Sequence, residues 1–223
     1  MWRSKTHRPA AGIALAALLL AAPAAADTGG TDDFPPAGKL RYAVTRNGDE
    51  IGTHEMEFVR DGNRFTVLTR IDVAVTIAGI TAFRFSNQSD EEWVDGRLAS
   101  FVSTSDDDGK VHHVLVEPGS DGLWVTEHEH RKLFPGVRLV GTLWNPETAR
   151  QSLLVDPVDG RLRQVTIVDL GLEPVMVQGR PLQARHISIT GKLHREVWYG
   201  PDNRIVRFAF NAGDGSLIVA ELR

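Results

Sequence analysis

Apolar and polar residues alternate along most of the chain, starting at Lys39. The clearest run extends from Phe65 to Ile77, where every odd-numbered residue except Thr69 is apolar. Successive side chains of a β-strand point to opposite faces, so this period of two predicts a strand with one buried face. Asn47-Gly48 and Asp61-Gly62 interrupt the alternation with residues that favour hairpin turns.

Similar short runs recur up to the C-terminus, except for an irregular stretch over residues 128–156. Within it, Pro146 to Leu154 is expected to form a short helix, because Asn145 is a good N-cap and proline fits the first helical position. The pattern predicts an all-β fold: a single antiparallel, strongly curved sheet or half-open barrel of about a dozen strands with one short helix. We expect residues 39–223 to form one β-rich domain; a division near residue 155 is the alternative.

Residues 1–26 follow a different pattern. Three basic residues precede a charge-free run from Ala10 to Ala22, and Ala24-Ala25-Ala26 precedes Asp27. This order is typical of a secretory signal peptide, with cleavage predicted after Ala26. A membrane anchor is the alternative, but the run is shorter than the ~20 residues that cross a bilayer. We therefore predict a periplasmic or secreted protein in which residues 27–38 form a flexible lead.

Charge and cysteine content narrow the range of partners. Signal cleavage leaves 22 basic and 29 acidic residues, so the formal net charge changes from −4 to −7. An acidic chain argues against nucleic-acid partners and against docking on anionic lipid headgroups. The absence of cysteine excludes disulfides, thiol chemistry and a lipidation box. No later run is apolar enough for an integral membrane span after signal cleavage.

Residue types that catalyse reactions or bind metals form no recognisable motif. His128 and His130 would share one face of an extended strand, and His112-His113 is a second pair, but no third ligand is indicated. Residues 106–109 lack the ligand order of a calcium loop, which favours a hairpin turn. No phosphate loop or dinucleotide fingerprint occurs. The sequence thus predicts no catalytic residues, no metal site and no cofactor.

The remaining candidate chemistry is apolar. A strongly curved sheet can leave part of its concave face unfilled, and such a face binds an acyl chain or another apolar molecule. The expected helix over residues 146–154 would cover this face. The competing interpretation is that the same side chains form an ordinary core. The candidate ligand-binding residues are Val73, Val75, Ile77, Phe83, Phe85, Trp93 and Trp144.

Short motifs occur along the chain in a specific order: Tyr42-x-Val44, Gly48, Ile51-Gly52, Trp93-Val94-Asp95-Gly96-Arg97-Leu98, Trp144-Asn145, Asp159-Gly160 and Trp198-Tyr199-Gly200-Pro201-Asp202. This order resembles a bacterial family of secreted β-rich proteins classified as a domain of unknown function, over residues 39–223. The resemblance implies a periplasmic protein with an antiparallel, curved sheet. By weaker similarity, the chain resembles the half-barrel carriers that shield lipoprotein acyl chains. The family implies no catalytic residues.

These observations favour a non-enzymatic periplasmic protein that binds a lipid or other apolar molecule, or a cell-envelope protein. One alternative is a structural or interaction module with a filled core, which would use its sheet edges to pair with a partner strand. A second alternative is an envelope hydrolase acting on glycans or esters, whose catalytic groups would be brought together only by folding.

Overall fold

The computed structural model describes residues 33–223, which form one antiparallel sheet of 14 strands. The predicted signal peptide and residues 27–32 of the predicted lead lie outside the described residues. The strands are β1 (Gly38–Arg46), β2 (Asp49–Asp61), β3 (Arg64–Ile77), β4 (Ile80–Val94), β5 (Arg97–Asp107), β6 (Lys110–Gly119), β7 (Gly122–Glu127), β8 (His130–Pro135), β9 (Leu153–Val155), β10 (Leu162–Val177), β11 (Arg180–Gly191), β12 (Arg195–Tyr199), β13 (Ile205–Asn211) and β14 (Leu217–Leu222).

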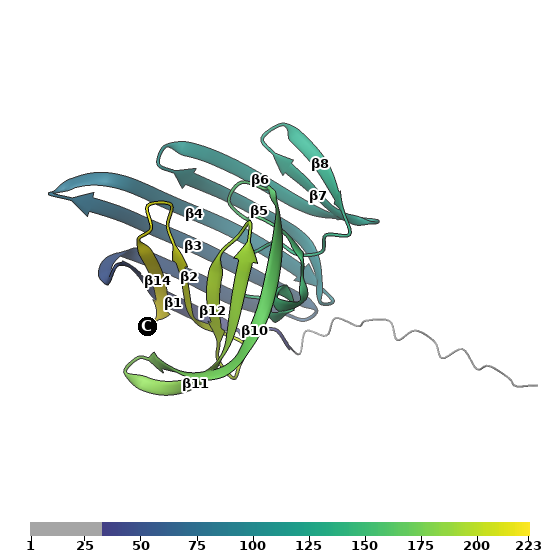
Figure 1. Ribbon diagram of the computed structural model, residues 1–223. Helices are drawn as coiled ribbons and strands as arrows, with labels where there is room; N and C mark the ends of the chain where they lie inside the picture. Colours follow the sequence, from purple (N-terminus) through teal and green to yellow (C-terminus); the bar gives the residue numbers. More distant parts are fainter. Residues whose placement is uncertain (1–32) are drawn as a thin grey trace, which may run out of the picture.

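The sheet consists of two meanders that meet in its middle. Strands β1 to β8 each pair with their sequence neighbours, and so do β9 to β14. The meanders join where β1 pairs with β14, which places Tyr42 opposite Leu222. The outermost strands of the sheet, β8 and β9, do not pair with each other within residues 33–223, so the sheet curves without closing (Figure 1). The predicted fold class is confirmed.

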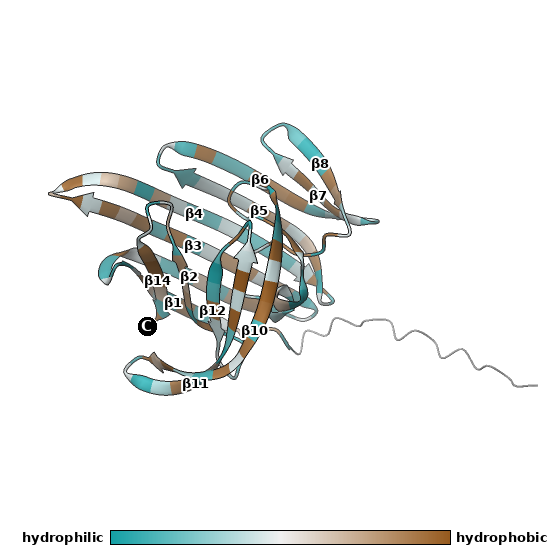
Figure 2. Ribbon diagram, in the orientation of Figure 1, coloured by the Kyte–Doolittle hydropathy of each residue, from teal (hydrophilic) through white to brown (hydrophobic). Residues whose placement is uncertain are grey.

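The turn chemistry follows the sequence closely. Asn47 and Gly48, between β1 and β2, have positive φ angles of 51° and 95°. A two-residue turn of this kind matches the twist of the strands it joins. Alternating hydrophobic and hydrophilic segments then follow one another along the strands in Figure 2.

The expected helix is shorter than predicted. Residues Pro146–Arg150 form a 3₁₀ helix, η2, and Asn145 Oδ1 accepts a hydrogen bond from the Glu147 backbone N–H across 2.9 Å. Residues 153–155 form strand β9 instead of continuing the helix. Leu154 and Val155 are fully buried there. They lie opposite Arg163 and Leu162 of β10, and Val155 also forms a bridge with Val140.

The main core lies against the inner face of the sheet and includes the connection between β8 and β9. Leu139, Val140 and Trp144 of this connection are buried. The Trp144 ring centroid lies 5.6 Å from that of Trp93 and 5.1 Å from that of Phe34. Phe34 belongs to the lead that the sequence predicts to be flexible, yet it is only 8% exposed. Its ring fills the aromatic core, so the chain is anchored before β1 begins.

Candidate functional site

The hairpin of β3 and β4 extends beyond both of its neighbours. The pairing of β2 with β3 ends where Gly52 lies opposite Val73, and the pairing of β5 with β4 ends where Asp107 lies opposite Phe85. Residues 74–84 therefore form a two-stranded ribbon without a further strand partner in the described chain. The ribbon is the leftmost tip in Figure 1. Its turn contains Ala78 and Gly79, both with positive φ.

One face of this hairpin end is apolar. Its inner-face side chains form three directly opposed cross-strand pairs, which we call the apolar strip: Val73–Phe85, Val75–Phe83 and Ile77–Ile80. The same period of two buries Phe65 and Val67 further along β3, so the strip continues the face that makes the core. The other face of the ribbon carries small or polar side chains: Ala74 and Thr76 on β3, and Arg84 opposite Ala74 on β4.

The strip becomes exposed toward the tip. Val73, Val75 and Phe85 are half-buried, whereas Phe83 is 37%, Ile77 58% and Ile80 73% exposed. Removing one such side chain from water is worth about 1.5–3 kcal/mol. Neighbouring exposed apolar residues are typical of binding surfaces, while isolated ones are not. The strip therefore has the chemistry of a surface that gains from contact with an apolar ligand or partner.

The seven candidate ligand-binding residues separate into two groups. Five of them, the valines, Phe83, Phe85 and Ile77, lie together on the strip. Trp93 and Trp144 lie in the aromatic core, where they are 4% and 1% exposed. Trp93 is eight residues from Phe85 along β4, which at a rise of about 3.3 Å per residue places it about 26 Å away. Ile80 completes the strip and was missing from the prediction, although it directly follows the turn.

A polar band separates the strip from the aromatic core. Its side chains, which come from the inner faces of β3, β4 and β5, are Thr69, Asn87, Ser89, Ser103 and Ser105, and all are buried. Asn87 Nδ2 donates to Ser105 Oγ across 2.9 Å, and Ser103 Oγ donates to the carbonyl oxygen of Pro157 across 2.6 Å. The turn between β9 and β10 thus covers this band. The inner face is not one continuous apolar groove.

Glu91 is a buried carboxyl at the base of this band. It is 2% exposed and accepts hydrogen bonds from Trp93 Nε1, Thr142 Oγ1 and Trp144 Nε1 at 3.0, 2.9 and 2.8 Å. Burial raises its pKa to about 7, against the lowering effect of these donors. A raised carboxyl pKa is a feature of some catalytic sites. Two of the donors, Trp93 and Trp144, belong to the aromatic core and the third, Thr142, to the connection that crosses it, so we interpret Glu91 as a structural anchor.

Three side chains of types that bind metals meet on the inner face of the sheet at β6 and β7, away from the apolar strip. His112 on β6, Glu127 at the end of β7 and His128 in the following turn each place a ligand atom within 4.8 Å of the others. His112 Nδ1 lies 2.8 Å from Glu127 Oε1. His128 has a positive φ of 51°, so the chain turns there and His130 does not share its face as an extended strand would require. The pairing of β6 with β7 brings His112 close to Glu127 and His128, a proximity that their spacing in the sequence does not indicate.

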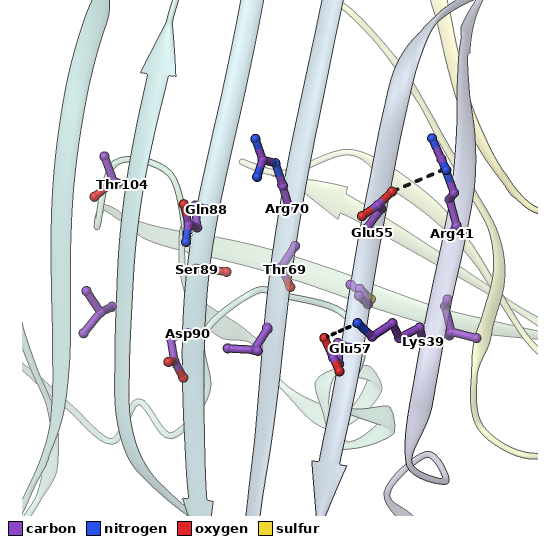
Figure 3. A pocket seen from close by; sticks show the side chains of 14 residues that line it. Lys39, Arg41, Glu55, Glu57, Thr69, Arg70, Gln88, Ser89, Asp90 and Thr104 are labelled. Atoms are coloured by element: carbon purple, nitrogen blue, oxygen red, sulfur yellow. Dashed lines mark ion pairs between the residues drawn. The ribbon is translucent and has the colours of Figure 1, made fainter.

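The outer face of β1 to β5 carries a cavity of about 730 Å³. Figure 3 shows its charged side chains, with ion pairs of 3.0 Å between Lys39 and Glu57 and of 3.3 Å between Arg41 and Glu55. Because acidic and basic side chains pair with one another, the cavity offers no uniform charge to a ligand. A smaller cavity of about 360 Å³ lies beside η2 and includes Ile187 and Tyr199.

Comparison with known proteins places this architecture in a family. The sequence profile of the family "Domain of unknown function (DUF6134)" matches residues 42–223. The chain belongs to this family. The match confirms the resemblance seen in the sequence to a β-rich domain of unknown function. A search of curated protein sequences found no match.

The fold also resembles a solved structure, the crystal structure of a β-barrel-like protein of domain of unknown function DUF1849 from Brucella abortus. The TM-score is 0.61 at 12% sequence identity, and the alignment covers 85% of this chain and 96% of the other. At this identity the similarity shows the fold alone. Within residues 33–223, no helix has the length and apolar character needed to cross a membrane.

Proposed function

We propose that this DUF6134 protein is a non-enzymatic, periplasmic binding protein whose apolar strip holds the acyl chain of a lipid. The observation that carries the proposal is the exposed inner face of the β3–β4 hairpin, where Ile77, Ile80 and Phe83 face solvent in adjacent cross-strand positions. The signal-like N-terminus supports the periplasmic compartment. A protein in that compartment is close to the lipids of the cell envelope, whose acyl chains would be ligands for the strip.

The shape of the strip favours an extended, flexible ligand. Three cross-strand pairs in succession make a surface about five residues long, which at about 3.3 Å per residue is about 16 Å. The strip is narrow, since only two strands contribute to it. An acyl chain matches a long and narrow apolar surface, and it needs no hydrogen-bonding groups where the strip offers none.

The alternative of a module that pairs its sheet edge with a partner strand has less support. The outer strand β8 carries Arg131 and Lys132, and charged residues on an edge oppose strand addition. The alternative of an envelope hydrolase would need a solvent-facing catalytic group. The carboxyl with the raised pKa, Glu91, is enclosed by its own donors.

Native mass spectrometry of the mature protein, released gently from the periplasm, tests the proposal. We expect an adduct with the mass of one lipid, which solvent extraction then identifies. The purified protein should also bind a dansyl-labelled fatty acid, with increased fluorescence. Ile80→Asp should weaken this binding at least ten-fold without affecting folding, because Ile80 is 73% exposed.

Leu217→Asp is the matched control, since Leu217 is 45% exposed on β14 and lies outside the strip. It should bind the fluorescent fatty acid like the wild type. A clean apo mass together with equal binding by the wild type and Ile80→Asp would overturn the proposal. Cell fractionation that leaves the protein in the cytoplasm would overturn its periplasmic part.

A further inference from the structure

The cluster of His112, Glu127 and His128 has no part in the apolar strip. We propose that these three side chains bind one divalent transition-metal ion of the class that includes Zn²⁺. The proposal is independent of the lipid-binding function, because the cluster lies on β6, β7 and the turn after β7, and the strip on β3 and β4.

The donor set points to this class of ion. Two imidazole nitrogens and one carboxylate oxygen form the same ligand set as in three-residue zinc sites, which keep a fourth position for water. Imidazole suits zinc, copper and nickel, whereas calcium and magnesium prefer oxygen ligands alone. The sequence offers no cysteine to compete for a soft metal.

The distances allow an ion to enter with small side-chain movements. Around a tetrahedral zinc ion with bonds of about 2.0–2.1 Å, ligand atoms are about 3.4 Å apart. The ligand atoms here lie within 4.8 Å of one another, and His112 Nδ1 and Glu127 Oε1 are 2.8 Å apart, joined by a hydrogen bond. The ion would take the place of the proton that these two atoms share and draw the His128 ring inward.

The backbone holds the three residues in position. His112 is 5% exposed and lies on β6, opposite Ser105 of β5. The His128 backbone N–H donates to the carbonyl oxygen of His113 across 3.2 Å, which fixes the turn after β7. Burial decreases from His112 through Glu127 to His128. The exposed His128 side therefore gives an ion a path from solvent and leaves room for a water ligand.

Without a metal, the cluster would be only a buried histidine hydrogen-bonded to a carboxylate. His128 distinguishes the two interpretations. It would be a ligand in a metal site, whereas it makes no contribution to the His112–Glu127 hydrogen bond. Its exposure also makes His128→Ala a variant that should fold normally. His130→Ala is the matched control, since His130 is an exposed histidine two residues away and outside the cluster.

The experiment is a titration of the untagged mature protein with ZnCl₂, read by isothermal calorimetry, together with CoCl₂ titration read by visible absorption. We expect one ion per chain and, for cobalt, the intense bands of a four-coordinate site. His112→Ala and His128→Ala should each weaken binding at least ten-fold, and His130→Ala should bind like the wild type. Circular dichroism of each variant checks the fold.

Absence of stoichiometric zinc binding would overturn the proposal. So would wild-type affinity in His128→Ala, or an equal loss in His130→Ala, which would indicate adventitious binding by surface histidines. Should His112→Ala fail to fold, Glu127→Gln and His128→Ala decide the question, because both side chains reach the surface.

Discussion

The indole Nε1 of Trp144 donates a hydrogen bond to Glu91 Oε2 across 2.8 Å, although the two residues are 53 positions apart. This bond ties the connection between β8 and β9 to strand β4. It also explains why a carboxyl is tolerated among aromatic rings. The donors of Trp93, Thr142 and Trp144 occupy both of its oxygens.

Glu91→Gln should lower stability by about 1–3 kcal/mol, because the amide nitrogen cannot accept the hydrogen bond that one oxygen now receives. The loss should be larger at pH 5 than at pH 8. Burial raises the pKa of Glu91 from 4.5 to about 7, so its proton stabilises the fold below pH 4.5 and this contribution is lost as pH rises through 7. Urea unfolding of both proteins at the two pH values measures the effect. An equal loss at both would contradict a raised pKa.

His54 should make the stability of the fold depend on pH in the opposite direction, with stability lost as the pH falls. It is 6% exposed, and neither ring nitrogen has a hydrogen-bond partner among the described residues. Burial lowers its pKa from 6.5 to about 4, so the stability present above pH 6.5 is lost as pH falls toward 4. Its ring lies 5.4 Å from those of Tyr42 and Phe208.

His54→Phe keeps these ring contacts and removes the ionisation. We expect its stability relative to the wild type to improve steadily from pH 7 to pH 4.5, by up to about 3 kcal/mol. Thermal unfolding across this range, with His194→Phe at an exposed position as the control, measures the difference. A constant difference between His54→Phe and the wild type would show that His54 does not resist protonation.

Strands and turns were predictable from the sequence because their signals are local. The alternation from Phe65 to Ile77 fixes both the strand and its inner face. Where the neighbouring strands end is not a local property. Only the pairing shows that β2 leaves β3 at Gly52 and that β5 leaves β4 at Asp107, and this decides which alternating residues become the exposed strip.

The candidate site was therefore predicted in part. Tryptophan is a common residue type in ligand-binding sites, but Trp144 lies in a connection that crosses the core. No periodicity in the sequence indicates that position. His112 and Glu127 are 15 positions apart and meet only through the register of β6 and β7. The sequence shows two histidine pairs, His112-His113 and His128/His130. One member of each pair, His112 and His128, belongs to the cluster.

Gly52→Ala should disrupt the pairing of β2 with β3. A Cβ atom at this position would lie 2.0 Å from the backbone oxygen of Asp72, so the backbone of the neighbouring strand must move. We expect a loss of about 3 kcal/mol, at the upper end for overpacking. Gly213→Ala is the control, because its Cβ would meet nothing within 4 Å. Chemical denaturation compares the two; equal midpoints would contradict the expectation.

Arg163 on β10 holds together the turn between β9 and β10. Its Nε lies 2.9 Å from Asp156 Oδ2 and its Nη2 lies 2.7 Å from Asp159 Oδ2, all in partly buried positions. A lysine keeps the charge but cannot reproduce this two-pronged geometry. Arg163→Lys should therefore lower stability by about 1–2 kcal/mol, and hydrogen exchange should speed up in residues 156–161.

Arg161→Lys provides the comparison, because the Arg161 side chain is 68% exposed and its Nε lies 3.6 Å from Asp159 Oδ2. Exposed pairs of this kind contribute about 0–1 kcal/mol, so the change should be small. Equal effects of the two substitutions would mean that Arg163 acts only through its charge. A larger effect confined to Arg163 would show that this turn, which covers Ser103 and the polar band, depends on a directional clamp and not on net attraction.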